Sequence, residues 1–147
     1  AEAQSLGYAE ADPSGDVLGW DAAGKVVILT NTVLRKPLKL DEVQLASGIT
    51  EITPAHIEEA KKAGERWKLV AQAKVEDGTV KASVLAQRIP LSDPLAGVMG
   101  PTNAVTFHTD LLGPVTIVGA GAGQRETAFA VISDLLDIHA TLLARQG

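Results

Sequence analysis

Asp21 and Lys25 are the two residues of this sequence whose types and spacing most directly suggest chemistry. Four residues apart on a helix, their side chains lie on one face, about 40° apart around the axis. On an exposed face such a pair is an ordinary ion pair, which stabilises a helix by about 0.2–0.5 kcal/mol. In a desolvated site, an ammonium group beside a carboxylate can bind a substrate or transfer a proton. The pair by itself leaves both interpretations open.

The segment that carries this pair favours the second interpretation. Residues 16–31 read as a helix that is apolar almost all round, which is typical of a buried helix rather than an amphipathic one. Gly19 and Gly24 interrupt it, although each glycine costs a helix about 1 kcal/mol relative to alanine. We therefore expect another backbone or a ligand to approach this helix closely.

A second candidate is the loop of residues 7–13, which contains the carboxylates of Glu10 and Asp12. Carboxylates before a helix can cap its first turn or face water, and they can also bind a cationic group of a ligand. On the residue types alone, capping or solvation is favoured over ligand binding.

A third candidate is the glycine-rich turn of residues 119–123, between a predicted strand and a predicted helix. Backbone N–H groups at a helix start attract phosphates, and glycine allows close approach. A dinucleotide fingerprint needs G-x-G-x-x-G within a βαβ unit and an acidic residue about 20 positions later. The third glycine is absent and no strand follows the helix. The turn is therefore not a complete nucleotide site, but it is suited to form one wall of such a site.

The bulk properties of the chain exclude several function classes. Its 147 residues suffice for one domain, and a net charge of −5 argues against nucleic acid or an anionic membrane as a partner. The absence of cysteine excludes disulfides, thiolate catalysis and cysteine-ligated metals, which fits a cytoplasmic location. No uninterrupted apolar stretch approaches the roughly 20 residues that span a bilayer, so no membrane partner is expected.

The three histidines, His56, His108 and His139, are widely spaced and lie near no matching pattern of acidic residues. Metal sites bring several ligands together at characteristic spacings. We therefore interpret each histidine as structural and expect no metal site.

The residue periodicities predict two or three helices and at least four strands. Besides residues 16–31, helices are expected from residue 53 or 54 to about 63 and from about 126 to 144; strands are expected near 67–75, 80–86, 104–109 and 114–118. This pattern indicates an α+β fold in which helices pack on one face of a mostly antiparallel or mixed sheet.

The first two of these strands carry the clearest signal, a hairpin that turns at Asp77 and Gly78. This turn predicts four apolar pairs on one face: Val75 with Val80, Ala73 with Ala82, Ala71 with Val84, and Leu69 with Ala86. It also places Lys74 opposite Lys81, so we expect water on that face. Val70 and Leu85 are apolar neighbours on the same, otherwise polar, face.

Three segments resemble the homoserine dehydrogenase family. G-Y-A-E-A-D-P at residues 7–13, followed by Asp16, Gly19, Asp21 and Lys25, closely resembles that family's G-Y-x-E-x-D-P…D-x-x-G-x-D-x-x-x-K run. The segment of residues 48–52 before a Thr-initiated helix, and G-A-G…T-A at residues 121–128, are similar to the family's next element and to its closing turn and helix. The order and spacing of these segments hold over nearly the whole chain.

The resemblance implies the reversible reduction of L-aspartate 4-semialdehyde to L-homoserine with NADH or NADPH, on the path to threonine and methionine. It implies that Lys25 is the general acid that protonates the carbonyl oxygen. The implied ligands are Glu10 and Asp21 for the substrate, and Gly7, Gly121 and Gly123 for the cofactor, NAD or NADP. One departure is Gly24, where the family usually has a basic residue.

The resemblance also implies an organisation in which this chain is the substrate-binding half. Residues 1–120 would bind substrate and form a homodimer through the sheet, and residues 121–147 would form a turn and helix that pack on an N-terminal Rossmann half. Because cofactor chemistry depends on that half, we expect the 147-residue chain alone to be inactive. The alternatives are a related two-domain oxidoreductase with another small aldehyde or keto acid, and a non-catalytic dimerisation or ligand-sensing module.

Overall fold

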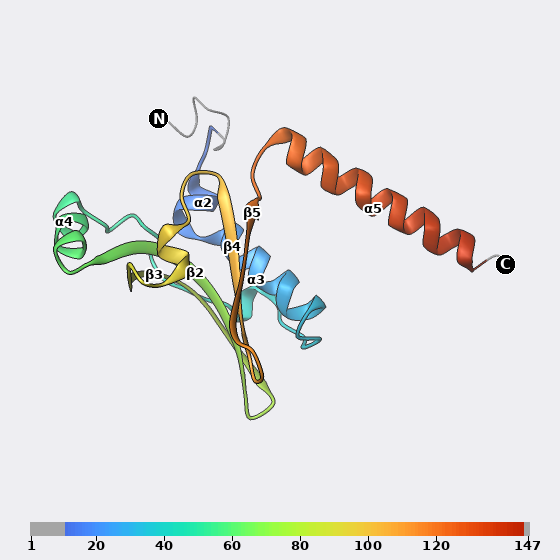
Figure 1. Ribbon diagram of the computed structural model, residues 1–147, viewed down its shortest axis with the longest axis horizontal. Coiled ribbons are helices and arrows are strands. Elements are labelled where there is room, and N and C mark those ends of the chain that lie inside the picture. The colour runs from blue at the N-terminus through green and yellow to red at the C-terminus, as the bar shows by residue number, and fades with distance from the viewer. Residues whose placement is uncertain (1–10, 146–147) are drawn as a thin grey trace. The chain divides into compact units, whose positions relative to one another are not determined.

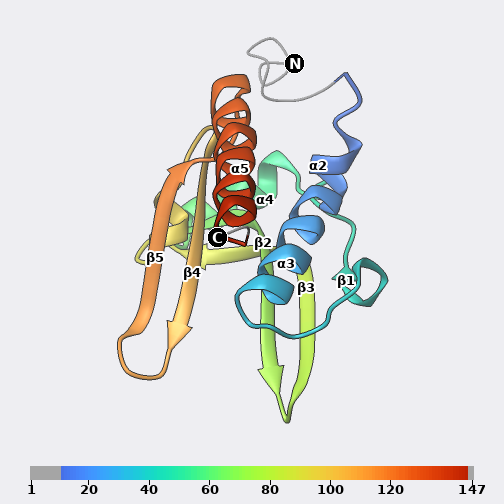
Figure 2. The same ribbon diagram turned by 90° about the vertical axis from the view of Figure 1, so that its right-hand side faces the viewer.

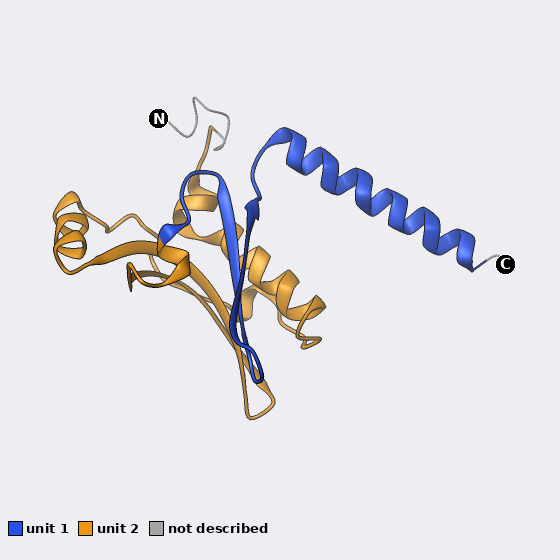
Figure 3. Cartoon of the chain, in the orientation of Figure 1, with its two compact units in different colours: residues 1–8, 97–147 blue, residues 9–96 orange. Residues whose placement is uncertain are grey.

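The computed structural model describes residues 11–145. It divides the chain into two compact units (Figure 3), which we name the sheet unit, residues 9–96, and the hairpin–helix unit, residues 1–8 and 97–147. The division at 96/97 reflects packing within this chain. The sequence analysis divides the chain instead between residues 120 and 121, because the last helix is expected to pack on a separate nucleotide-binding half. That boundary stays a prediction.

The sheet unit combines helices with a three-stranded mixed sheet (Figure 1). Strand β3 is central, with β2 antiparallel on one side and the short β1 parallel on the other. The elements are α2 (Ser14–Leu18), α3 (Trp20–Thr32), η1 (Leu40–Glu42), β1 (Gln44–Leu45), α4 (Pro54–Lys62), β2 (Glu65–Glu76), β3 (Thr79–Pro90) and η2 (Pro94–Gly97). The predicted α+β class with a mixed sheet is confirmed.

The core of the sheet unit forms where α3 lies against β2 and β3 (Figure 2). Small and β-branched residues of α3 pack on apolar residues of β3 and of the segment that follows α3. The buried cluster consists of Ala23, Val26, Leu38, Val43, Ala82 and Val84. Burial of this apolar area holds α3 on one face of the sheet.

The prediction of one buried helix over residues 16–31 is wrong in two respects. The helix breaks at Gly19, whose φ of 89° lies in the left-handed region. In addition, α3 buries only one face, and Trp20 and Ile28 are 50% and 63% exposed. The expected close approach is confirmed at Gly19, where an added β-carbon would lie 2.9 Å from Cγ1 of Val84. It is absent at Gly24, where an added β-carbon would meet no atom of another element within 4 Å in the described part of the chain.

The predicted hairpin and its register are confirmed. All four predicted apolar pairs are cross-strand partners, and so are Val70 and Leu85. Asp77 and Gly78 have φ values of 50° and 78°, as a turn with two left-handed residues requires. Lys74 does face Lys81, and Glu76 forms ion pairs with both, at 2.7 and 2.6 Å.

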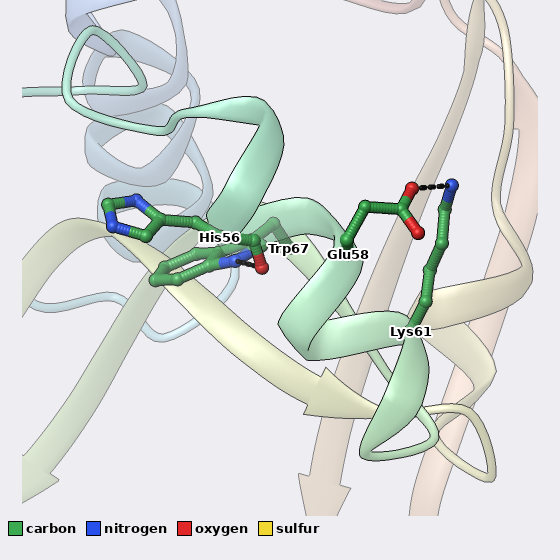
Figure 4. Close-up of polar contacts among 4 residues, drawn as sticks. All are labelled: His56, Glu58, Lys61 and Trp67. Atoms are coloured by element: carbon green, nitrogen blue, oxygen red, sulfur yellow. Dashed lines mark hydrogen bonds and ion pairs between the residues drawn. The ribbon is translucent and has the colours of Figure 1, made fainter.

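The predicted helix over residues 54–63 is confirmed as α4, and its capping explains His56. Thr53 and His56 cap the helix reciprocally: the His56 N–H donates to Thr53 Oγ1, and the Thr53 N–H donates to His56 Nδ1, both at 3.3 Å. The indole of Trp67 donates to the His56 carbonyl oxygen at 3.1 Å (Figure 4). These contacts give His56 a structural role.

The hairpin–helix unit contains β4 (Thr102–Thr109), β5 (Gly113–Ala120) and α5 (Gln124–Ala144). The two strands are antiparallel and extend beyond the predicted ranges, and the hydroxyls of Thr106 and Thr116 lie 2.9 Å apart across them. The predicted C-terminal helix is confirmed and begins two residues earlier than expected.

Helix α5 buries none of its residues, although it is rich in large apolar side chains. Eight of these are 51–74% exposed: Phe129, Val131, Ile132, Leu135, Leu136, Ile138, Leu142 and Leu143. By length and composition α5 is able to cross a membrane. The apolar run of α5 is not uninterrupted, because Asp134 and Asp137 lie within it. Carboxylates at the middle of a helix are costly in a bilayer, which favours a protein surface as the cover of α5.

Candidate functional site

The Asp21–Lys25 pair lies in the first two turns of α3, as the spacing predicts. Lys25 Nζ is 2.6 Å from Asp21 Oδ2. The side chains of Lys25 and Asp21 are 56% and 50% exposed. Residues 11–145 therefore align the two groups but do not desolvate them, so any desolvation must come from something that covers this face of α3.

The surface around the pair is apolar and open. Exposed Ile28 lies one turn after Lys25, and an added β-carbon at Gly24 would meet no atom within 4 Å. Exposed apolar surface next to charged groups is typical of a face that binds a ligand or another domain. The face of α3 that carries Lys25 is therefore a candidate active site. Residues 11–145 supply the aligned pair but not the groups that would exclude water from it.

The position of α3 on the sheet is set at Gly19. An added β-carbon at Gly19 would meet side chains of three strands, Val84, Leu69 and Leu45. The Gly19 carbonyl oxygen accepts the N–H of Ala23 at 2.9 Å and so begins α3. Since only glycine fits this close approach at a φ of 89°, the start of the site helix is fixed on the sheet.

The loop of residues 7–13, which we call the carboxylate loop, is described only in part. Asp12 is among the described residues, while Gly7 and Glu10 lie outside them. Asp12 Oδ1 accepts the N–H of Ser14 at 3.0 Å at the start of α2. This backbone hydrogen bond lowers the pKa of Asp12 below its ordinary value. Asp12 therefore has a local structural role, since it closes a turn just before α2, whose N-cap is Pro13; Glu10 remains the candidate for ligand binding.

The glycine-rich turn is shaped by two side chains of the same unit. A β-carbon at Gly121 would overlap the side-chain amide of Asn103, and one at Gly123 would overlap the carboxylate of Glu126. Gly123 also has a φ of 138°. The backbone conformation therefore requires glycine at position 123, whereas a larger residue at position 121 would require the Asn103 side chain to move. Sequence reasoning missed Asn103, because no local pattern links it to a turn 18 positions away along the chain.

Glu126 also changes the electrostatics of this turn. Its carboxylate lies beside Gly123 at the N-terminus of α5, where it offsets the positive end of the helix dipole. A phosphate placed there would meet a negative charge. The turn is therefore better suited to a neutral part of a ligand than to an anion.

A separate groove of about 580 Å³ lies between α4 and the sheet, and neither Asp21 nor Lys25 lines it. Its walls are mainly apolar and include Ile57, Trp67 and Leu69. Lys68 also lines it, and burial, with a smaller contribution from the Arg66 charge, lowers the pKa of Lys68. Within residues 11–145, no group of three or more histidine or acidic side chains is arranged to hold a metal ion.

Comparison with known proteins gives concordant matches. A family model described as homoserine dehydrogenase matches residues 1–136. The chain is 44% identical to the NAD(+)-dependent homoserine dehydrogenase of Pseudomonas canavaninivorans, covering 99% of this chain and 42% of that protein. It is 41% identical to the homoserine dehydrogenase of Methanocaldococcus jannaschii, covering 94% of this chain and 39% of that protein.

Solved structures agree with the sequence matches. A homoserine dehydrogenase from Thiobacillus denitrificans superposes with a TM-score of 0.88 at 38% identity, over 97% of this chain and 33% of that chain. The S. aureus homoserine dehydrogenase crystallised at pH 6.5 superposes with a TM-score of 0.85 at 40% identity, over 95% of this chain and 35% of that chain. The chain thus spans about two fifths or less of the length of these relatives.

Proposed function

The chain belongs to the homoserine dehydrogenase family, and we propose that the full-length protein interconverts L-aspartate 4-semialdehyde and L-homoserine with NAD or NADP. The observation that carries the proposal is the aligned Asp21–Lys25 pair, with its 2.6 Å contact, on an open apolar face of α3. A pair arranged in this way can protonate an aldehyde oxygen once a ligand and a second domain exclude water from it.

In the reducing direction, Lys25 donates a proton to the carbonyl oxygen as that oxygen gains negative charge. Asp21 keeps the ammonium group of Lys25 aligned and, in the substrate complex, binds the hydroxyl end of homoserine. Glu10 binds the amino end. In the oxidising direction, neutral Lys25 accepts the hydroxyl proton. Holding donor and acceptor in this geometry converts proton transfer into a step within one complex.

A nicotinamide cofactor supplies the hydride that the aldehyde carbon receives. The described residues fit the nicotinamide end of such a cofactor, because exposed Ile28 offers apolar surface one turn from Lys25 and an added β-carbon at Gly24 would meet no atom within 4 Å. We assign contacts with the cofactor to Gly7, Gly121 and Gly123. The Glu126 carboxylate supports a contact of the closing turn with a neutral part of the cofactor rather than with its phosphates.

The remaining features of the proposal concern assembly. Helix α5 would pack its apolar side chains on the N-terminal nucleotide-binding half. The sheet would form the contact of a homodimer, in which the cross-strand pair Val70 and Leu85 lies at the interface. The full-length protein would act in the cytoplasm, without nucleic acid or a membrane as partner.

Oxidation of homoserine by the purified full-length protein, followed by absorbance of the reduced cofactor, tests this function. We expect turnover of homoserine with NAD or NADP and none by the 147-residue chain alone. A panel of other small hydroxy acids and aldehydes provides the comparison. Preference for another substrate would favour the related-oxidoreductase alternative, and no turnover of any of them would favour a non-catalytic module.

A further inference from the structure

The position of the Lys25 amine depends, among the described residues, on helix α3 alone. Its ion-pair partner Asp21 belongs to the same helix, and the Lys25 side chain is 56% exposed. Both side chains leave α3 on the side opposite to the buried Ala23 and Val26. The contacts that fix the direction and rotation of α3 therefore also fix where the ammonium group of Lys25 meets a substrate.

The core contacts of α3 hold the helix on the sheet but give it limited precision. Its buried residues, Ala23, Val26 and Thr30, are small or β-branched. Burial of apolar surface is non-directional and depends mainly on the area removed from water. A small shift of α3 would keep most of this burial, yet it would move the end of a long side chain such as that of Lys25. Directional contacts at the ends of the helix supply the precision that burial lacks.

The last turn of α3 makes such a contact through the side chain of Asn31. Asn31 Oδ1 accepts the Leu38 N–H at 2.8 Å, and Asn31 Nδ2 donates to the Leu38 carbonyl oxygen at 3.0 Å. One side-chain amide thus pairs with both backbone groups of one residue, as the backbone of a neighbouring antiparallel strand does. We call these two hydrogen bonds the Asn31 clamp.

The Asn31 clamp ties α3 to a residue that is itself fixed. The Leu38 side chain is 6% exposed and belongs to the same buried cluster as Ala82 and Val84 of β3. Beyond Leu38 the chain continues through η1 into β1, which pairs with the central strand β3. The clamp therefore joins the last turn of α3 to the sheet by a second route, besides the core contacts of α3 itself.

The loop between the two clamped residues has a conformation that needs support. Arg35 has a φ of 51°, in the left-handed region that residues other than glycine rarely adopt. Such a residue persists there only when surrounding contacts hold it. The Lys36 N–H donates to the Thr30 carbonyl oxygen at 3.3 Å, and the two hydrogen bonds of Asn31 follow at Leu38. The clamp thus closes the loop directly behind its strained residue.

We propose that Asn31 is a positioning residue for the reaction: through the clamp it fixes the last turn of α3 and thereby holds the Lys25 amine within reach of the substrate's carbonyl oxygen. Gly19 fixes the other end of the helix against Val84. Lys25 lies midway, six residues from Gly19 and six from Asn31. The inference rests on the proposed function, because it assigns the proton transfer to Lys25. Asn31 acts through α3 and not by contact with the substrate.

The test uses the full-length protein with Asn31→Ala, Asn31→Asp, Lys25→Ala and the double variant of Asn31→Ala with Lys25→Ala. Alanine removes both hydrogen bonds of the clamp and favours a helix, so helix propensity does not account for a loss of activity. An ionised aspartate still accepts the Leu38 N–H but cannot donate to the carbonyl oxygen. Steady-state kinetics with homoserine give kcat and KM for each variant, and thermal unfolding shows that each is folded.

Thr109→Val is the matched control. The Thr109 hydroxyl also pairs with two backbone groups, since it accepts an N–H at 3.0 Å and donates to a carbonyl oxygen at 2.9 Å. These bonds close the turn between β4 and β5, in the hairpin–helix unit. The substitution therefore removes the same kind of contact from a part of the chain that does not carry Lys25.

We expect Asn31→Ala to lower kcat for homoserine oxidation by about 10- to 100-fold with KM changed by less than about threefold, as expected when a proton-transfer group is misplaced. Asn31→Asp should lower kcat by a smaller factor, because one hydrogen bond of the clamp remains. In the Lys25→Ala background, Asn31→Ala should change kcat by less than about twofold, since the amine that it misplaces is absent. Thr109→Val should leave kcat within about twofold of that of the unmodified protein.

An unchanged kcat in Asn31→Ala, with or without a change in KM, would overturn the inference. An undiminished effect of Asn31→Ala in the Lys25→Ala background would also overturn it, because the clamp would then act on the fold in general. If Asn31→Ala does not fold, Asn31→Asp replaces it in both backgrounds. Failure of the unmodified protein to oxidise homoserine would instead refute the proposed function, so the two failures are distinguishable.

Discussion

Gly19 lies so close to Val84 that a β-carbon at position 19 would stand 2.9 Å from the valine Cγ1. This contact joins the start of the site helix to the central strand of the sheet. Because the φ of Gly19 is also 89°, both the space and the backbone conformation require glycine there.

The variant Gly19→Ala should therefore lower the free energy of unfolding by about 1–3 kcal/mol, from backbone strain and overpacking together. Chemical denaturation followed by circular dichroism measures the change. Gly15→Ala is the control, since Gly15 is in α2 with no atom within 4 Å and alanine favours a helix. Equal stability of the two variants would show that the contact at Val84 relaxes without cost.

Thr30 offers a substitution that should stabilise the protein. Its side chain is in the core, 1% exposed, and its hydroxyl has no hydrogen-bond partner among the described residues. Replacing a buried, unpaired hydroxyl by a methyl group removes a desolvation cost, so Thr30→Val should raise the free energy of unfolding by about 1 kcal/mol. Thr32→Val is the control, because that hydroxyl is exposed and donates to the Ile28 carbonyl oxygen at 2.7 Å. A loss of stability in Thr30→Val would reveal a partner for the buried hydroxyl.

The catalytic assignment of Lys25 has a matched comparison within the chain. Lys61 forms an ion pair of the same length, 2.6 Å, with Glu58 on the exposed face of α4 (Figure 4). In the full-length protein, Lys25→Ala should lower kcat for homoserine oxidation by about 10²- to 10⁴-fold, because a general acid–base group is lost. Lys61→Ala should leave kcat within about twofold, since an exposed helix pair contributes little. If both substitutions had the same effect on kcat, Lys25 would be an ordinary surface residue.

Features of this fold that neighbouring residues specify were predictable from the sequence, and features that depend on distant residues were not. The β2–β3 hairpin was predictable in full, because alternation and the Asp77-Gly78 turn both specify its register. The break at Gly19 was not, because the same glycine is compatible with a continuous helix until the sheet lies beneath it. The cap of α4 was predictable from Thr53 and Pro54, which lie next to each other in the chain.

The candidate site likewise has features that the sequence predicts locally and features that depend on residues far apart in the chain. The alignment of Asp21 and Lys25 follows from their spacing on one helix. The contact of Asn103 with Gly121 joins residues 18 positions apart, and no periodicity specifies it. Lys25 was expected to be desolvated, but its side chain is exposed among residues 11–145. The atoms that would exclude water from Lys25 must therefore come from outside these residues.

Glu76 makes the stability of the β2–β3 hairpin depend on pH. Hydrogen bonds from Lys74 and Lys81 lower the pKa of Glu76 below its ordinary value of 4.5, and the carboxylate raises the pKa of Lys74 above its ordinary value of 10.5. A carboxylate with a lowered pKa stabilises the folded state above its unfolded pKa, and this stabilisation is lost as pH falls through the folded pKa. For Lys74 the stabilisation is lost as pH rises through its raised pKa.

The variant Glu76→Gln should therefore have a lower Tm than the unmodified protein at pH 7, by an amount that added salt reduces. The difference should shrink as pH falls well below 4.5, where Glu76 itself becomes neutral. Thermal unfolding of both proteins at a series of pH values measures this difference in Tm. A difference in Tm that is constant across this range would mean that the ion pairs contribute nothing and that the substitution acts through packing alone.

Helix α5 should behave differently in the isolated chain and in the full-length protein. Its large apolar side chains, Leu135 among them, are exposed here, and a helix of this kind is stable in water only when another surface covers it. In the full-length protein, Leu135→Asp should lower the free energy of unfolding by about 2–5 kcal/mol, as expected when a buried leucine is lost and a charge is buried. In the 147-residue chain the same substitution should instead reduce self-association, measured by light scattering. Thr141→Asp on the same helix is the control and should have a smaller effect in both proteins. An equal loss of stability from Leu135→Asp in the isolated chain would mean that α5 already packs within it, and the predicted contact with a nucleotide-binding half would lose its support.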